Sequence, residues 1–107
     1  MQIYKTPLRE FKFLIEDFLN LKESQTLKKL DLETSDLMLI IEEAAKLCEE
    51  TLLPLNQSGD SEGCSFNNGV VTAPKGFKEA YKTFSENGWQ GLKVKEEFGG
   101  QNLPYIM

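Results

Sequence analysis

Residues 35–53 carry the most regular pattern in the chain, and this pattern limits the possible folds more than any other feature. Apolar residues recur there at three- and four-residue spacing, which places them along one face of an α-helix. They are Leu37, Ile40, Ile41, Ala44, Ala45, Leu47, Cys48 and Leu52. Pro54 has no N–H for a helical hydrogen bond and disfavours helical geometry at Leu53, so we expect the helix to end at Leu52 or Leu53.

Two other segments show the same periodicity. Residues 8–21 follow Thr6-Pro7, a capping hydroxyl and a proline suited to the first helical position. Residues 76–87 end at Asn87-Gly88, which supplies the left-handed residue that commonly stops a helix. The two apolar stripes are Leu8, Phe11, Leu14, Ile15, Phe18 and Leu19 in the first segment, and Phe77, Ala80, Tyr81 and Phe84 in the second. The sequence therefore predicts an all-α fold, a small helical domain of about three main helices.

The connections between these helices differ in character. Residues 22–34 are polar and are predicted to hold one short helical turn. Residues 54–74 are rich in turn-forming residues, and Asn68-Gly69 lies between Phe66 and Val70-Val71, which predicts a short β-hairpin. A structureless loop of that length is unusual in a compact domain, so either the hairpin forms or the segment contacts something outside this chain.

Composition narrows the class of protein. A chain of 107 residues makes one domain at most, and 17 acidic against 12 basic residues give a net charge of −5, which weighs against a nucleic-acid partner. No apolar run approaches the length of a membrane span, and the first residues lack the apolar core of a secretory signal. We therefore expect a soluble, cytoplasmic protein.

The chain offers few groups for catalysis. It contains no histidine, which removes Ser-His and Cys-His nucleophiles and the commonest general base. Cys48 and Cys64 indicate neither a zinc site nor a disulfide framework, and free thiols are expected. The acids of the long helix, Glu42, Glu43, Glu49 and Glu50, are interpreted as a solvated face rather than as paired catalytic carboxylates. The residues therefore indicate neither a histidine-dependent nucleophile nor a metal site in this chain.

The densest group of glycines and aromatic residues lies in residues 76–104. On spacing alone this block is a helix followed by a packed turn with Trp89 as a core anchor. The alternative is a loop shaped for a purpose, because its glycines provide backbone freedom and allow close approach of other groups. These glycines are Gly88, Gly91, Gly99 and Gly100.

The residue pattern of this block resembles a motif of a known protein family. Gly88-Trp89-Gln90-Gly91-Leu92, followed by Glu96-Glu97-Phe98-Gly99-Gly100-Gln101-Asn102-Leu103-Pro104, is similar to the segment of acyl-CoA dehydrogenases that closes the first part of their N-terminal helical domain. Many members carry a proline where this chain has Lys95. Earlier stretches resemble a large-chain bacterial subgroup with an N-terminal extension, and they are Tyr4-Lys5-Thr6-Pro7-Leu8-Arg9, Phe13, Pro54-Leu55-Asn56, Gly59-Asp60, Glu62-Gly63 and Pro74-Lys75-Gly76-Phe77.

The resemblance implies a function for a longer protein. Acyl-CoA dehydrogenases are homo-oligomeric FAD enzymes that desaturate acyl-CoA thioesters between the α and β carbons, with a glutamate as base and the flavin as hydride acceptor. In the family those groups come from a middle β-domain and a C-terminal helical bundle, and no residue here matches the base. We therefore expect residues 1–34 to be the N-terminal extension with one helix, and residues 35–107 to be the first part of the N-terminal helical domain. Alone, the chain is expected to hold no cofactor and to be inactive.

Eight positions follow the family motif and are expected to be structural or to shape a pocket: Gly76, Phe77, Trp89, Gly91, Glu97, Phe98, Gly99 and Gly100. The last three are expected to turn the chain toward helices that line the acyl pocket.

Two alternatives stay open. One is a small helical module that binds a partner or itself, and the other is a structural remnant without function. Because 40% of the residues are hydrophobic, we expect some of Phe11, Phe18, Trp89 and Phe98 to be exposed or covered by another copy, most simply in a two-fold dimer.

Overall fold

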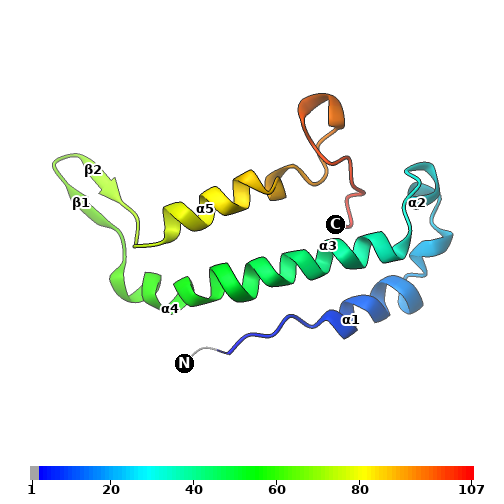
Figure 1. Cartoon of the computed structure of the whole chain (residues 1–107), viewed down its shortest axis with the longest axis horizontal. Helices are drawn as coiled ribbons and strands as arrows, with labels where there is room; N and C mark the ends of the chain where they lie inside the picture. Colours follow the sequence, from blue (N-terminus) through cyan, green and yellow to red (C-terminus); the bar gives the residue numbers. More distant parts are fainter. Residues whose placement is uncertain (1–2) are drawn as a thin grey trace.

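The computed structural model describes residues 3–107, which are mostly helical, as the sequence predicts. Figure 1 shows three helical segments side by side, a hairpin at one end and a loop that projects near the other. The chain measures 55 × 37 × 15 Å, and its smallest extent is little more than the diameter of one helix with its side chains, about 10–12 Å. The helices therefore form a single layer.

The first helical segment consists of α1 (Leu8–Phe13) and a π-helical turn over Leu14–Phe18. It begins where the sequence predicts but does not reach residue 21, because Asn20 is in the left-handed conformation with φ 47°. The predicted cap is also wrong. No side chain caps α1, and the backbone N–H of Thr6 is instead bound by a distant glutamate described below.

Two short helical pieces occupy the connection that was predicted to hold one. They are a 3₁₀ turn over Leu21–Glu23 and α2 (Gln25–Lys29). Leu27 of α2 is buried and is only 2% exposed. Leu27 packs with Ile15, Leu37 and Met38 in the hydrophobic core at this end of the layer.

The long helix is longer than predicted. It comprises α3 (Thr34–Lys46), a π-helical turn over Leu47–Leu52, and α4 (Leu53–Glu62), so the expected end at Leu52 or Leu53 is wrong. The π turn changes the hydrogen-bonding pattern of the backbone before α4 begins. Pro54 therefore lies in the first turn of α4, where proline is tolerated although it lacks an N–H. At the other end the Asp36 carboxylate accepts a hydrogen bond from the Glu33 N–H at 2.8 Å, which helps to fix the helix start.

The second half of the 54–74 segment is the predicted hairpin. Strands β1 (Ser65–Asn67) and β2 (Val70–Thr72) pair antiparallel, with Phe66 opposite Val71. Asn68 and Gly69 both have positive φ, 49° and 79°, as the tight turn of a two-residue hairpin requires. Helix α5 (Phe77–Glu86) follows and ends at Asn87 and the left-handed Gly88, in agreement with the sequence.

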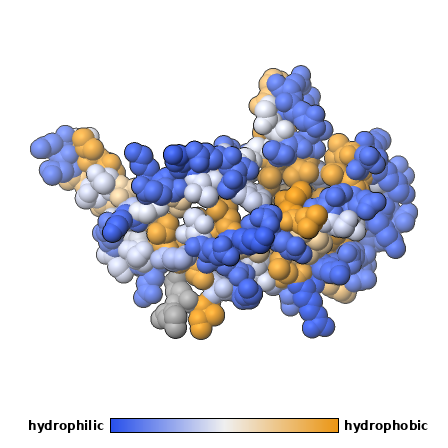
Figure 2. Space-filling model, viewed as in Figure 1, coloured by the Kyte–Doolittle hydropathy of each residue, from blue (hydrophilic) through white to orange (hydrophobic). Residues whose placement is uncertain are grey.

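The single layer leaves much surface uncovered. The accessible surface is 8343 Å², whereas a compact monomer of 12.2 kDa exposes roughly 6,000 Å². The radius of gyration of 17.4 Å likewise exceeds the roughly 13 Å of a compact domain of this length. Figure 2 shows apolar side chains at the surface between the helices. Phe11, Phe18 and Phe98 are exposed as expected, while Trp89 is half-buried and is not a core anchor.

Candidate functional site

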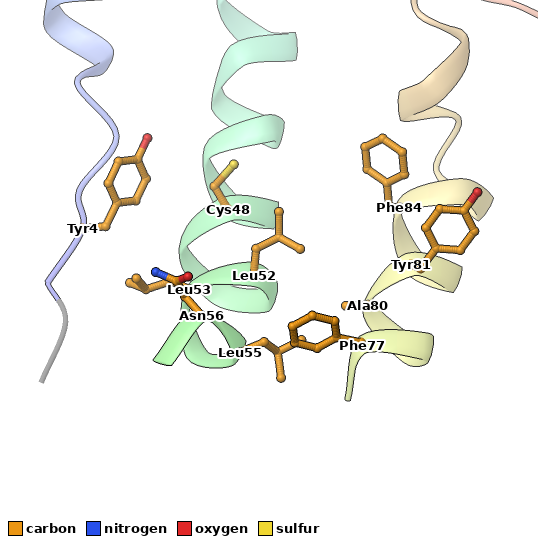
Figure 3. Close-up of a pocket in the computed structure, with 10 residues that line it drawn as sticks. All are labelled: Tyr4, Cys48, Leu52, Leu53, Leu55, Asn56, Phe77, Ala80, Tyr81 and Phe84. Atoms are coloured by element: carbon orange, nitrogen blue, oxygen red, sulfur yellow. The ribbon is translucent and has the colours of Figure 1, made fainter. Parts of the chain in front are cut away.

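An apolar groove of about 500 Å³ lies between α5 and the long helix (Figure 3). Phe77, Tyr81 and Phe84 enter it from α5, and Cys48, Leu52 and Leu55 from the long helix. Figure 3 places the side chains of Leu52 and Phe84 between the two ribbons. The apolar stripes of the two helices predict both walls of this groove. Leu55 lies one helical turn beyond Leu52 and was not predicted as part of the wall, because the helix was expected to end at Leu52 or Leu53.

A second groove of about 380 Å³ runs between the first helical segment and α3. Its walls include Phe11, Leu14 and Leu19 on one side and Ile41 and Ala45 on the other. Tyr4 and Cys48 line both grooves, so the two meet and lie on one face of the layer. We call the joined grooves the apolar trough.

Two glycines allow the walls of the trough to approach. A Cβ on Gly59 would lie 2.4 Å from Cζ of Phe77, so α4 and α5 pack closely only because this side chain is absent. Gly76 has φ 88°, and a Cβ there would lie 2.7 Å from Cδ2 of Leu55. Of the motif positions, Gly76 and Phe77 therefore belong to the trough.

An ion pair fastens the N-terminal segment along the long helix. Glu49 Oε2 lies 2.8 Å from Lys5 Nζ, and Glu49 Oε1 accepts a hydrogen bond from the Thr6 N–H at 2.8 Å. These two bonds, Lys5 first, lower the pKa of Glu49 to about 2, and the same pairing raises the pKa of Lys5. The interpretation of Glu49 as a solvated residue was wrong, because its side chain is only 19% exposed. No local sequence pattern predicts a contact of Glu49 with Lys5 and Thr6, which lie more than 40 residues away.

The opposite face of the layer carries both charged and apolar residues, because an apolar hollow lined by Leu39, Ile40, Leu92 and Leu103 adjoins a more polar one and shares Glu43, Asn87 and Trp89 with it. Glu43, Lys46, Glu50 and Thr83 line a hollow there together with Trp89. Lys46 and Glu43 form an ion pair, and the hydrogen bond that Lys46 donates to this carboxylate raises the pKa of Lys46. The remaining acids of the long helix therefore behave as the sequence indicated.

The remaining motif positions form a separate loop. Its ends are tied by backbone hydrogen bonds from the Gln101 N–H to the Gly91 carbonyl at 3.0 Å, and from the Leu103 N–H to the Leu92 carbonyl at 2.8 Å. A Cβ on Gly100 would lie 1.9 Å from the Val94 carbonyl oxygen. The loop thus needs glycine at position 100 for close approach, as the sequence suggests.

The tip of this loop points to solvent. Gly99 is left-handed with φ 83°, and Glu97 and Phe98 next to it are exposed. The structure therefore separates the eight motif positions into two groups, with Gly76 and Phe77 at the start of α5 and the others beyond its end. They do not converge on one pocket.

The trough offers chiefly apolar contact. Both cysteines are free, Cys48 half-buried in the trough and Cys64 exposed. Within residues 3–107, no three side chains of the types that bind metals come together. In the same part of the chain, the helices are too short or too polar to cross a membrane.

Comparison with known proteins bears on the resemblance of the sequence to acyl-CoA dehydrogenases. No family model matches the chain. It is 35% identical over 105 residues to 3-methylmercaptopropionyl-CoA dehydrogenase of Ruegeria pomeroyi, and this match covers 97% of the chain. The chain spans 18% of the length of that relative. The resemblance seen in the sequence is thereby confirmed.

Proposed function

We propose that this chain forms part of the N-terminal helical domain of an FAD-dependent acyl-CoA dehydrogenase. The observation that carries this proposal is the 35% identity to such an enzyme across nearly the whole chain. The reaction it serves removes a weakly acidic α-proton from a thioester and transfers a hydride from the β-carbon to the flavin. The enzyme as a whole would act on an acyl-CoA.

Within that enzyme, the chain contributes packing rather than chemistry. The trough walls are apolar side chains and do not fit FAD, whose diphosphate requires several hydrogen-bond donors. We therefore assign no proton or hydride transfer to these residues and expect the isolated chain to be inactive. The trough is the face that would pack on the remainder of the enzyme, because an apolar helical layer needs a second layer to cover it.

The motif positions take structural roles in this proposal. Gly76 and Phe77 shape the trough, and the loop that carries Phe98, Gly99 and Gly100 turns the chain toward the helices that line the acyl pocket. Trp89, Gly91 and Glu97 support the same loop. We retain the division into an extension over residues 1–34 and a domain part over residues 35–107, and a cytoplasmic location.

A chimera tests the proposal. The segment of the Ruegeria pomeroyi enzyme that matches this chain would be replaced by residues 1–107, and flavin content and oxidation of 3-methylmercaptopropionyl-CoA would be measured. We expect a yellow, active chimera, and an isolated chain that neither binds FAD nor reduces an artificial electron acceptor. An enzyme that folds but loses flavin only in the chimera, or stoichiometric FAD on the isolated chain, would contradict the proposal.

A second candidate is a self-association module. The observation that favours it is the surface of 8343 Å², well above that of a compact monomer. Large exposed apolar patches on soluble proteins usually mark an interface. Light scattering across a concentration series, together with binding of a hydrophobic dye, distinguishes an associating chain from a monomer that closes its own core.

A further inference from the structure

The first helical segment lies alongside the long helix and is attached to the layer at two places (Figure 1). At one of them Ile15, in the π-helical turn that follows α1, is buried in the hydrophobic core. At the other, just before α1, Lys5 and Thr6 are bonded to Glu49. Between these attachments α1 has no buried residue. The position of α1 therefore depends on the contacts at Glu49, because α1 itself gains little from burial.

Thr6 makes the inner contact with Glu49. The side chain of Lys5 is 82% exposed, so its ion pair is expected to contribute little to stability. The Thr6 hydroxyl oxygen is buried and forms no hydrogen bond within residues 3–107. It lies close enough to Glu49 to help lower the pKa of that carboxyl, after Lys5 and the Thr6 N–H. Because a buried hydroxyl is costly without a partner and a carboxylate accepts several hydrogen bonds, we expect this hydroxyl to strengthen the attachment.

The attachment borders the place where the two grooves meet. Tyr4 lines both grooves together with Cys48, which directly precedes Glu49. In Figure 3 the Tyr4 ring lies between the N-terminal ribbon and the long helix. Thr6 and Phe11 line the second groove as well. A movement of this segment away from Glu49 would therefore widen the second groove and uncover Cys48, which is half-buried.

We propose that residues 3–13 form a flap that closes the second groove, with Ile15 as its pivot and Glu49 as its latch. In the closed form, Thr6 holds the flap through its N–H and its hydroxyl. In the open form the hydrophobic core stays intact, while the second groove and Cys48 become accessible from solvent. This inference concerns the chain itself and does not depend on the proposed function.

Labelling of Cys48 with N-ethylmaleimide, in a Cys64→Ser background, tests the latch without a change of charge. Thr6→Val keeps the shape of the side chain and loses the hydroxyl, whereas Thr6→Ser keeps the hydroxyl. We expect Thr6→Val to raise the labelling rate roughly three- to tenfold, and Thr6→Ser to leave it within about twofold. Equal acceleration in both variants, or none in Thr6→Val, would overturn the role of the hydroxyl in the latch.

Two further measurements test the latch residue and the pivot. Glu49→Gln should raise the labelling rate of Cys48 at least as much as Thr6→Val. Glu50→Gln removes a charge equally near in sequence and should leave the rate unchanged, so equal rates in these two variants would overturn Glu49 as the latch. Hydrogen exchange of the Ile15 amide should stay constant in every variant. Exchange at Ile15 that rises in step with labelling of Cys48 would show unfolding of the core and overturn the flap.

Discussion

The apolar trough and the loop between Gly91 and Leu103 are both open to solvent, but they differ in whether their own residues satisfy and cover them. The loop closes on itself, because its own backbone groups pair and Gly100 fits against the Val94 carbonyl. The trough has walls but no cover, and its side chains are apolar. The most recognisable motif of the chain is therefore completed by its own backbone, whereas the helical stripes leave apolar side chains uncovered.

Two exposed rings illustrate the difference. Tyr81 in the trough is 70% exposed and Phe98 at the loop tip is 75% exposed. Exposure alone does not distinguish them. Their surroundings do, because Tyr81 adjoins Phe77 and Phe84 along a continuous apolar wall, while Phe98 stands beside the charged Glu97 and two glycines.

The largest effect is expected from the floor of the trough. Leu37 is fully buried in the hydrophobic core and also lines the trough, so Leu37→Ala should lower the free energy of unfolding by about 3 kcal/mol. Leu39→Ala, at an exposed position on the same helix, should change it by less than about 0.5 kcal/mol. Urea denaturation of both variants provides the measurement. Equal losses would show that the two faces do not differ as described.

A smaller, local effect is expected in the loop. In Gly100→Ala the new methyl group would collide with the Val94 carbonyl, which should lower the free energy of local opening by about 1–3 kcal/mol. Gly91→Ala is the matched control, because its Cβ would lie 3.7 Å from the nearest atom, an ordinary contact. Hydrogen exchange of the Gln101 and Leu103 amides reports the opening. Faster exchange in Gly91→Ala alone would refute the close approach at Gly100.

The smallest effect is expected where the N-terminal segment borders the trough. The pKa of Glu49 is depressed to about 2, so the folded state holds fewer protons than the unfolded state. The stabilisation from Glu49 is therefore complete above the ordinary pKa of a glutamate and is lost as pH falls toward 2. Amide signals of Lys5 and Thr6 should change in that window while those of the loop remain.

Glu49→Gln should produce the same change at neutral pH, because it removes the charge that holds Lys5. Glu50→Gln is the control, since Glu50 is exposed and lines the hollow on the opposite face. Amide signals of Lys5 and Thr6 that do not change down to pH 2 in the unsubstituted chain would contradict the role of Glu49.

Much of this fold follows from local sequence. The hairpin was predictable because Asn68-Gly69 fixes its turn, and α5 because Gly88 ends it. The passage of the long helix through Pro54 was not, because proline usually ends a helix and here it follows a π turn. The fastening of Lys5 to Glu49 joins distant residues, which no local pattern reports.

The site was predictable in part for the same reason. The apolar stripes of the helices were visible as periodicity, but which face they leave uncovered depends on how the helices lie in one layer. The motif glycines were visible as well. Their separation into a trough group with Gly76 and a loop group with Gly100 required the structure.

Hydroxyl-radical footprinting over a range of protein concentrations tests the difference between trough and loop most directly. Oxidation of Tyr81 and of Phe98 would be quantified by mass spectrometry in the same samples, so each ring serves as the reference for the other. We expect oxidation of Tyr81 to fall at least threefold as concentration rises, while that of Phe98 stays constant. Equal protection of both rings, or protection of Phe98 alone, would contradict an apolar face that requires a second layer.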